Sequence, residues 1–396
     1  MTSRSRSDAS PTARLPEEGH RSLCEFSLAP ELVHLNHGSY GAVPRSVQAA
    51  QDRLREEIER DPTGYFQYRY PADVRRAIET AATRFGGAGS DWVFCENATA
   101  AVNAVLASLP LKRGDEIVTT SHAYGAVLKA MQLWAARRDA VVRLAEVPPL
   151  VESETQVIEA IAAAFSSRTR LLVVDHITSP TAIVFPIAEI VQAARAAGVP
   201  VLVDGAHAPG QVELDVPALG ADWYTGNAHK WFFAPRGCGL LWTAPQWQEI
   251  TRPAVLSHGT DRGYTESFDW IGTRDPSAWL SLPAAAAAFD RLGGTGLMAR
   301  NRRLAVEAAV LMTAKMNGKL SAPASMRAAM ASILLPGRVG SPEEAQRLRA
   351  GLHRAGFVVP VGSLGGGLWL RLSVQIYNQL ADYRRCAEAL LTPLVC

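Results

Sequence analysis

Lysine is rare in this chain of 396 residues, although the chain carries 40 basic side chains. Almost all of these are arginine, which stays protonated at neutral pH and cannot form a Schiff base. The lysines are Lys112, Lys129, Lys230, Lys315 and Lys319. Any covalent chemistry that needs a side-chain amine must therefore use one of these lysines.

Paired cysteines are also absent. The cysteines are odd in number, scattered and without a CxxC pair: Cys24, Cys95, Cys238, Cys386 and Cys396. A disulfide framework or a zinc knuckle needs cysteines at short, repeated spacings. We therefore expect free thiols, no metal site and a reducing cytoplasmic location.

The chain lacks a charge imbalance and a long apolar run. Its net charge of +2 gives no electrostatic reason to bind nucleic acid or an anionic membrane. The alanine-rich stretch Pro283–Phe289 is far too short to span a bilayer. Residues 1–22 are rich in Ser, Arg and Pro without an apolar segment, so we expect a disordered tail rather than a signal peptide.

Short apolar strands alternate with helices between residues 92 and 242. The expected strands are Trp92–Cys95, Glu116–Thr120, Arg170–Asp175, Pro200–Asp204, Trp223–Gly226 and Cys238–Trp242. Several are apolar on both faces, which is typical of buried parallel strands. The pattern predicts an α/β fold with a large, doubly wound and mostly parallel sheet at residues 60–262. Residues 23–59 together with 263–396 are expected to form a smaller α+β domain.

Small and polar residues follow these strands wherever they end. The strand-end segments are residues 96–99, 121–124, 175–179, 204–207 and 226–230. In an open α/β sheet, ligands bind beyond the carboxyl ends of the strands. Because buried polar groups cost free energy unless they bind something, these segments together predict a site.

Lys230 and Asp204 are the most informative residues at this edge. Lys230 lies between His229 and the aromatic run 231–233, where lost hydration lowers an amine pKa and makes the amine nucleophilic. Asp204 ends an apolar strand, where a carboxylate needs a cation. The protonated nitrogen of pyridoxal phosphate (PLP) is such a cation. A helix cap or an ion pair would also account for Asp204.

Three further features allow both a functional and a structural interpretation. Residues 97–99 precede a helix, whose free N–H groups attract an anion, although Asn97 could be a plain N-cap. His207 could reach a substituent of a bound ring or serve only the core. Tyr124 could lie over an aromatic cofactor, or simply pack inside the protein.

Two segments carry a family resemblance, Asp204-Gly205-Ala206-His207 and Asn227-Ala228-His229-Lys230. They resemble the cofactor signature of the class V aminotransferase group of fold-type I PLP enzymes, which includes cysteine desulfurases, kynureninases and isopenicillin N epimerase. The resemblance extends from about His34 to Ser373. Segments Leu35–Gly41 and Ser121–Val127 look most like the isopenicillin N epimerase-like proteins.

The resemblance implies a role for each matching position. Lys230 would hold PLP as a Schiff base, Asp204 would pair with the ring nitrogen and Tyr124 would stack on the ring. The ring hydroxyl would lie near His207 and near Ser179 or Thr178. The phosphate would be held by Ala98, Thr99, Asn227 and His229. Thr273 would reach the phosphate in a neighbouring subunit, which implies a homodimer. The substrate would be held by Asn36, His37 and Arg371, with Arg371 on the α-carboxylate.

This sequence departs from the desulfurase pattern at two points. Desulfurases carry a mobile cysteine shortly before the carboxylate-binding arginine, and no cysteine lies between Ala322 and Arg371. Desulfuration through a persulfide is therefore not expected. Tyr124 stands where desulfurases place a stacking histidine, which removes one acid–base group.

The expected function is proton removal from Cα of an amino acid or cysteine-derived conjugate, with Lys230 as general base. Epimerisation and C–S bond cleavage are the leading outcomes, and transamination and decarboxylation are alternatives. A non-catalytic sensor or scaffold is the rival from another class, but the intact Asp204, His229 and Lys230 argue against it. A nucleotide-binding oxidoreductase is disfavoured because no GxGxxG follows the first strand.

Overall fold

The computed structural model describes residues 19–338 and 340–391. Most of the tail predicted at residues 1–22 lies outside this part of the chain. Its last four residues begin a 3-10 helix, η1 (Gly19–Glu25). No helix of the described chain is long and apolar enough to cross a membrane.

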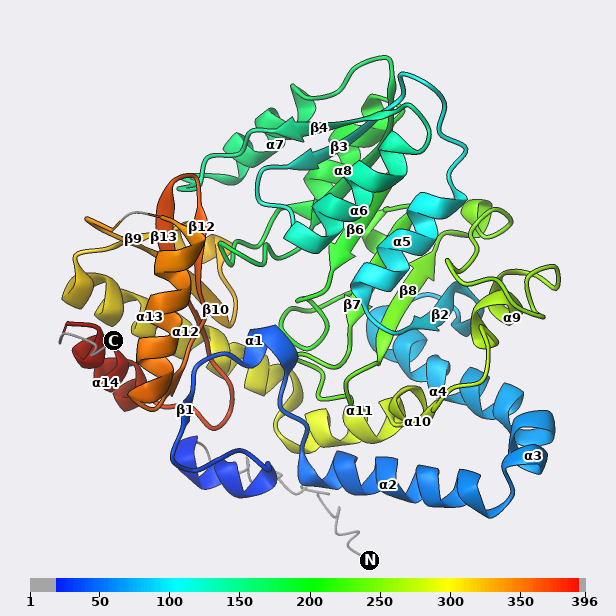
Figure 1. The fold of residues 1–396 in the computed structure, drawn as a ribbon, viewed down its shortest axis with the longest axis horizontal. Coiled ribbons are helices and arrows are strands. Elements are labelled where there is room, and N and C mark those ends of the chain that lie inside the picture. Colours follow the sequence, from blue (N-terminus) through cyan, green and yellow to red (C-terminus); the bar gives the residue numbers. More distant parts are fainter. Residues whose placement is uncertain (1–18, 339, 392–396) are drawn as a thin grey trace, which may run out of the picture.

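A seven-stranded sheet forms the centre of the molecule (Figure 1). Its strands are β2 (Trp92–Cys95), β3 (Glu116–Thr120), β4 (Val141–Ala145), β5 (Thr169–Asp175), β6 (Val201–Gly205), β7 (Trp223–Asn227) and β8 (Gly239–Thr243). Their order is β2-β8-β7-β6-β5-β3-β4, and β8 alone runs in the opposite direction to the other six strands. The prediction of a mostly parallel sheet is confirmed, and each predicted strand lies within one residue of its expected bounds. Strand β4 was not predicted, because this edge strand is mostly exposed and has no buried apolar run.

Helices cover both faces of this sheet. They are α4 (Tyr70–Phe85), α5 (Ala98–Ser108), α6 (Gly125–Ala136), α7 (Glu154–Ala162) and α8 (Ile187–Ala196). The apolar residues of α5 and α6 share a core with one face of the strands, through Ile117, Leu171 and Leu202. Residues of α4, α7 and α8 share a core with the opposite face, through Val118 and Leu172. This two-sided cover is the doubly wound arrangement that the sequence predicts.

A second, antiparallel sheet lies in the C-terminal part of the chain, at the left of Figure 1. Its order is β12-β13-β10-β9, from β9 (Lys319–Leu320), β10 (Met330–Leu335), β12 (Val361–Leu364) and β13 (Gly367–Ser373). Its helices are α12 (Gly294–Met316), α13 (Pro342–Arg354) and α14 (Leu380–Leu391). These elements lie within residues 263–396, where part of the smaller α+β domain is predicted.

The N-terminal segment returns to this C-terminal part. Strand β1 (Val33–His34) pairs in parallel with β11 (Phe357–Val358). The helices that complete the fold are α1 (His37–Tyr40), α2 (Arg45–Arg60), α3 (Pro62–Gly64), α9 (Tyr264–Asp269), α10 (Ser277–Leu280) and α11 (Leu282–Arg291). The short turns are the π-helix η2 (Tyr65–Arg69) and the 3-10 helices η3 (Gly89–Asp91), η4 (Pro217–Leu219), η5 (Pro245–Trp247) and η6 (Ala324–Met326). Buried residues of α10 and α11 belong to the core of the large sheet, so packing continues past the predicted boundary at residue 262.

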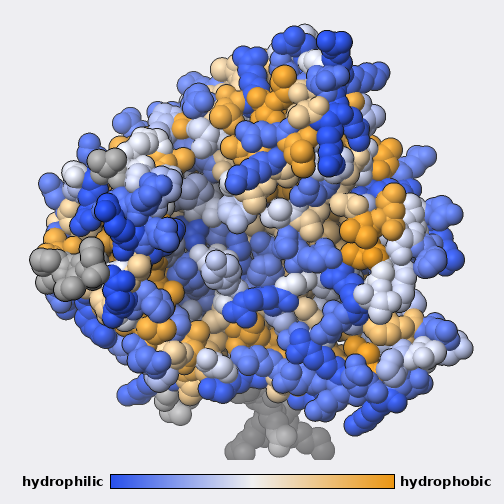
Figure 2. All heavy atoms as spheres, viewed as in Figure 1, coloured by the Kyte–Doolittle hydropathy of each residue, from blue (hydrophilic) through white to orange (hydrophobic). Residues whose placement is uncertain are grey.

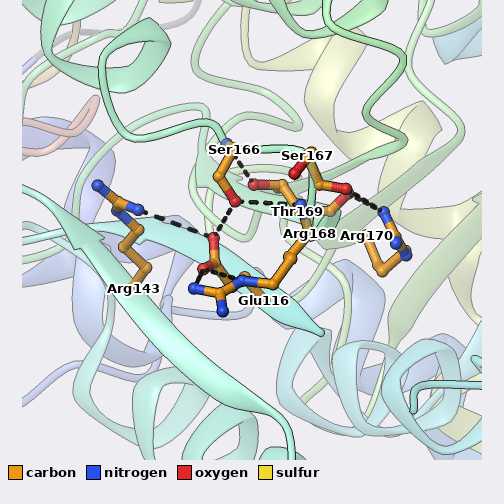
Figure 3. Close-up of polar contacts among 7 residues, drawn as sticks. All are labelled: Glu116, Arg143, Ser166, Ser167, Arg168, Thr169 and Arg170. Carbon is orange, nitrogen blue, oxygen red and sulfur yellow. Dashed lines mark hydrogen bonds and ion pairs between the residues drawn. The ribbon is translucent and has the colours of Figure 1, made fainter. Parts of the chain in front are cut away.

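A buried carboxylate ties the loop before β5 to the start of β3 (Figure 3). Glu116 accepts a hydrogen bond from the Ser166 hydroxyl at 2.6 Å and two from the Arg168 guanidinium at 3.1 and 2.8 Å. Arg143 approaches the same carboxylate at 3.8 Å. The Ser166 hydrogen bond, followed by the Arg168 contacts, lowers the Glu116 pKa despite its burial. The ionised form is therefore more stable in the folded state than in the unfolded state.

We expect Glu116→Gln to lower the free energy of unfolding at pH 7 by about 1–3 kcal/mol, since hydrogen bonds to a charged group are lost. The stability that Glu116 contributes is fully present at pH values above the ordinary pKa of a glutamate. It is lost as the pH falls through the lower pKa that Glu116 has in the folded state. The stability difference should therefore shrink in acid. Urea unfolding from pH 7 to pH 3, with the exposed Glu307→Gln as control, measures it. A difference that does not change with pH would contradict this account.

Candidate active site

The predicted site residues gather where β3, β5, β6 and β7 end. Asp175 of β5 and Asp204 of β6 are partners in register, and Lys230 lies in the turn that follows β7. Figure 2 shows the surface hollowed beside α1, between the lobe with β10–β13 and the lobe with β3–β6. Hydrophilic residues line much of this hollow.

Lys230 carries an amine that can be neutral near physiological pH. Burial, followed by the nearby charge of Arg371, lowers its pKa to about 7. Its Nζ lies 3.2 Å from Nε2 of His207, whose Nδ1 faces the Trp231 indole N–H at 3.4 Å. An indole N–H can only donate, so neutral His207 carries its proton on Nε2 and donates to the lone pair of the amine. Burial also lowers the His207 pKa well below its ordinary value, which keeps the ring neutral.

Asp204 presents a buried carboxylate that has no fixed cation. Its Oδ1 accepts the Ala206 N–H at 3.0 Å, and within the described residues no arginine or lysine forms an ion pair with it or with Asp175. Burial raises the pKa of Asp204, and burial together with the Asp204 charge raises the pKa of Asp175 well above its ordinary value. A bound cation such as a pyridinium would relieve this penalty. Sequence reasoning missed Asp175, although it carries the same signal as Asp204.

The N-terminus of α5 forms the anion-binding end of the site. Asn227 accepts the Ala98 N–H at 2.8 Å, and the Asn97 side chain caps Ala100 at 2.9 Å. The Thr99 N–H has no hydrogen-bond partner in the described chain. His229 Nδ1 is also buried without a partner, and burial lowers the His229 pKa to about 4. Asn227 and Ala98 therefore satisfy each other, while Thr99 and His229 keep unused groups for a phosphate.

Arg371 brings an uncompensated positive charge into the site from β13. Only 7% of the residue is exposed, and burial lowers its pKa to about 10. Nη1 donates to the carbonyl and hydroxyl of Ser179 at 2.6 and 3.1 Å, and Nη2 donates to Ser39 at 2.9 Å and Asn36 at 3.4 Å. Its Nε is buried without a partner. These neutral groups fix the guanidinium and leave its charge for an anion.

The segment around α1 joins Arg371 to the lysine turn. Asn36 and Ser39 contact Arg371, whereas His37 contacts the Lys230 carbonyl through Nε2 at 3.0 Å and the Tyr377 hydroxyl through Nδ1 at 3.0 Å. Burial lowers the His37 pKa to about 3, so the ring is neutral. Both ring nitrogens are thus taken by the protein. The predicted contact of His37 with substrate stays a prediction, and nothing in the sequence pointed to Tyr377.

A glycine permits this close packing. Gly41 has a φ of +68°, and a Cβ there would lie 2.1 Å from the carbonyl oxygen of His229. Any side chain at this position would push the N-terminal segment away from the turn that carries Lys230.

The remaining predicted residues separate into an inner and an outer group. Thr178 is fully buried. Its hydroxyl shares a hydrogen bond with the Thr181 hydroxyl at 2.7 Å and accepts one from the Ile183 N–H at 2.8 Å. Ser179 and Thr178 are the two residues predicted as alternatives near the ring hydroxyl. Of these two, only Ser179 contacts Arg371. Tyr124 is 46% exposed at the start of α6, and Thr273 is exposed between α9 and α10. The roles predicted for Tyr124 and Thr273 stay predictions.

The family of the chain follows from comparison with known proteins. Residues 69–382 match the family model for aminotransferase class V. The chain belongs to this family. It is therefore a PLP-dependent enzyme with the fold-type I architecture, as the sequence resemblance implied.

Similar proteins cover nearly the whole chain. It is 32% identical to an isopenicillin N epimerase from Streptomyces clavuligerus, over 92% of this chain and 95% of that one. It is 31% identical to a putative L-cysteine desulfhydrase of Oryza sativa subsp. japonica, over 90% and 82%. A cysteine desulfurase structure from Thermococcus onnurineus shares the fold, with 20% identity, a TM-score of 0.77 and coverage of 94% and 97%.

The site fits PLP in its details. Asp204 offers an uncompensated carboxylate, His229 Nδ1 and the Thr99 N–H are unused donors or acceptors, and Lys230 has an amine of depressed pKa. These are the groups that a pyridine nitrogen, a phosphate and an aldehyde require.

We expect Lys230→Ala to lose the covalent link to PLP and to lower turnover by about 10²–10⁴-fold, the usual contribution of a general base. Borohydride reduction followed by peptide mapping locates the linkage, and Lys112→Ala, which alters an exposed lysine, is the control. A pyridoxyl label on any other lysine of the wild-type protein would overturn the assignment.

Proposed function

We propose that this enzyme cleaves the C–S bond of a cysteine-derived α-amino acid by β-elimination. The observation that carries the proposal is that the buried Arg371 guanidinium, which has an unpartnered Nε, lies close enough to the Lys230 amine for its charge to lower the pKa of that amine. An amine with a pKa of about 7 is suited to remove a proton at neutral pH. A buried guanidinium without a carboxylate partner is suited to hold the α-carboxylate beside it.

Each side chain would have one task in this reaction. Arg371 binds the substrate carboxylate and fixes Cα near the Lys230 amine, which takes the Cα proton. Asp204 keeps a proton on the ring nitrogen, and His207 orients Lys230 through their 3.2 Å contact. When bound, PLP supplies an electron-withdrawing ring that accepts the electron pair left at Cα.

Sulfur then leaves from Cβ as a thiol. The overall reaction converts R–S–CH₂–CH(NH₃⁺)–COO⁻ and water into R–SH, pyruvate and ammonium. No described cysteine suits a persulfide carrier: Cys95, Cys238 and Cys386 are buried with raised pKa values, and Cys24 is exposed on η1. This supports direct release of the thiol rather than its storage on the protein. The desulfhydrase names among the relatives agree with that choice.

Epimerisation at Cα is the second candidate, because it shares the first proton transfer. It needs a proton donor on the ring face opposite Lys230, and the phenol of Tyr124 is the group that the family places there. The partly exposed Tyr124 and the epimerase relatives support this alternative.

Product analysis in D₂O separates the two reactions. With S-alkyl cysteines, the proposed lyase gives equal amounts of thiol and pyruvate. An epimerase instead gives the inverted amino acid with deuterium at Cα and no pyruvate, which would refute C–S cleavage.

Arg371→Lys should raise KM by about tenfold or more because the bidentate contact is lost, while the absorbance of bound PLP stays unchanged. An unchanged KM would remove Arg371 from the substrate site.

We also infer a cytoplasmic homodimer with shared sites. Thr273 lies on an exposed loop, as a residue that contacts a neighbouring subunit's cofactor must, and the described cysteines are free thiols. Sedimentation at assay concentration should give twice the chain mass, and Thr273→Ala should weaken PLP binding. A fully active monomer would rule out the shared site.

A further inference from the structure

A second arginine repeats the features that mark Arg371, in a different part of the molecule. Arg327 follows η6 and is only 4% exposed. Its Nη1 is buried without a hydrogen-bond partner, and its Nε makes only a long 3.4 Å contact with the Pro323 carbonyl. Within the described residues it forms no ion pair, and burial alone lowers its pKa. An unpaired buried charge is costly, so its retention calls for a partner.

This guanidinium lines a pocket of about 500 Å³ between the large sheet and the C-terminal part. Arg302 and Arg303, exposed on α12, line the same pocket, and within the described chain neither makes an ion pair. Glu213 contributes one exposed carboxylate. Three guanidinium groups therefore meet one carboxylate, and the pocket has an excess of positive charge.

The rest of the pocket wall is largely apolar. It includes Val184, Val212, Met298, Ala299 and Ala328. No residue predicted to bind PLP or substrate lines it, so it is distinct from the active site. A buried cationic end beside an apolar wall is complementary to an anionic head on a short apolar body.

The pocket nevertheless adjoins the lysine turn. Gln211, at its wall, donates to the His207 carbonyl at 2.7 Å and accepts the Ala329 N–H at 3.0 Å. His207 in turn contacts Lys230. An occupant would therefore touch a residue that connects the large sheet, the C-terminal part and the lysine turn.

We propose that this pocket is a binding site for a small organic anion, whose carboxylate or phosphate head pairs with Arg327 and whose apolar body lies on Val212 and Met298. Arg302 and Arg303 screen the head from the solvent side. The site is separate from the reaction and does not depend on the activity proposed above.

Calorimetric titration of the PLP-loaded enzyme with inorganic phosphate, acetate and hexanoate tests the site. Arg327→Met should weaken phosphate binding by about tenfold or more, as expected for loss of a charged hydrogen-bond partner. Arg302→Ala should weaken it less, and the exposed control Arg113→Ala should leave it unchanged. Hexanoate should bind more tightly than acetate, by about fourfold for each methylene that becomes buried. The phosphate and hexanoate arms distinguish the two kinds of head group.

Two controls keep the result unambiguous. Binding should persist in PLP-loaded Arg371→Ala, because Arg371 offers the other anion-binding guanidinium. Without added anion, Arg327→Met should melt at the same temperature as wild type or higher, since an unpaired buried charge is removed. Equal phosphate affinity in wild type and Arg327→Met would overturn the proposal, as would binding lost only in Arg371→Ala. If Arg327→Met does not fold, an unchanged affinity in Arg302→Ala would overturn it.

Discussion

The site depends on charged groups that are buried without an opposite charge. Within the described residues neither Asp204 nor Arg371 forms an ion pair, and the Lys230 amine, whose pKa both charges influence, has a depressed pKa. Each charge alone would destabilise the fold. The edge of the large sheet holds Asp204 and Lys230 in place, and β13 of the second sheet holds Arg371. Under the proposed function, the PLP ring nitrogen and the substrate carboxylate would supply the missing charges. Binding of cofactor and substrate would therefore relieve the free-energy cost of burying these unpaired charges. The affinity for both would then depend on where the fold places the charged side chains.

Much of this arrangement could be predicted from the sequence. Apolar runs such as Leu171–Val174 are buried on both faces, so β5 and its neighbours were evident, and the polar residues after them marked the correct sheet edge. Strand β4 lacks such a run. The pairing of Asp175 with Asp204 depends on strand register, which a sequence does not display. The contact between His37 and Tyr377 joins residues far apart in the chain, and no local pattern encodes it.

The segment 35–41 has a structural task besides the substrate contacts predicted for Asn36 and His37. Its polar side chains connect two parts of the site. Asn36 and Ser39 support Arg371, while His37 holds the Lys230 carbonyl. One short segment therefore contacts both the Arg371 guanidinium and the turn that carries Lys230, and a change in that segment would alter the positions of both.

The pairing of β1 with β11 also has a consequence for biosynthesis. Val33 pairs with Phe357, the Leu35 carbonyl accepts the Ser373 N–H, and His37 contacts Tyr377. During synthesis residues 33–37 emerge long before their partners at residues 357–377. The large sheet can form earlier from its own contacts, as domains do when they fold during translation. Arg371 and Lys230 reach their final positions only when residues 33–37 meet residues 357–377, so the nascent chain has no complete active site before residues 357–377 have left the ribosome.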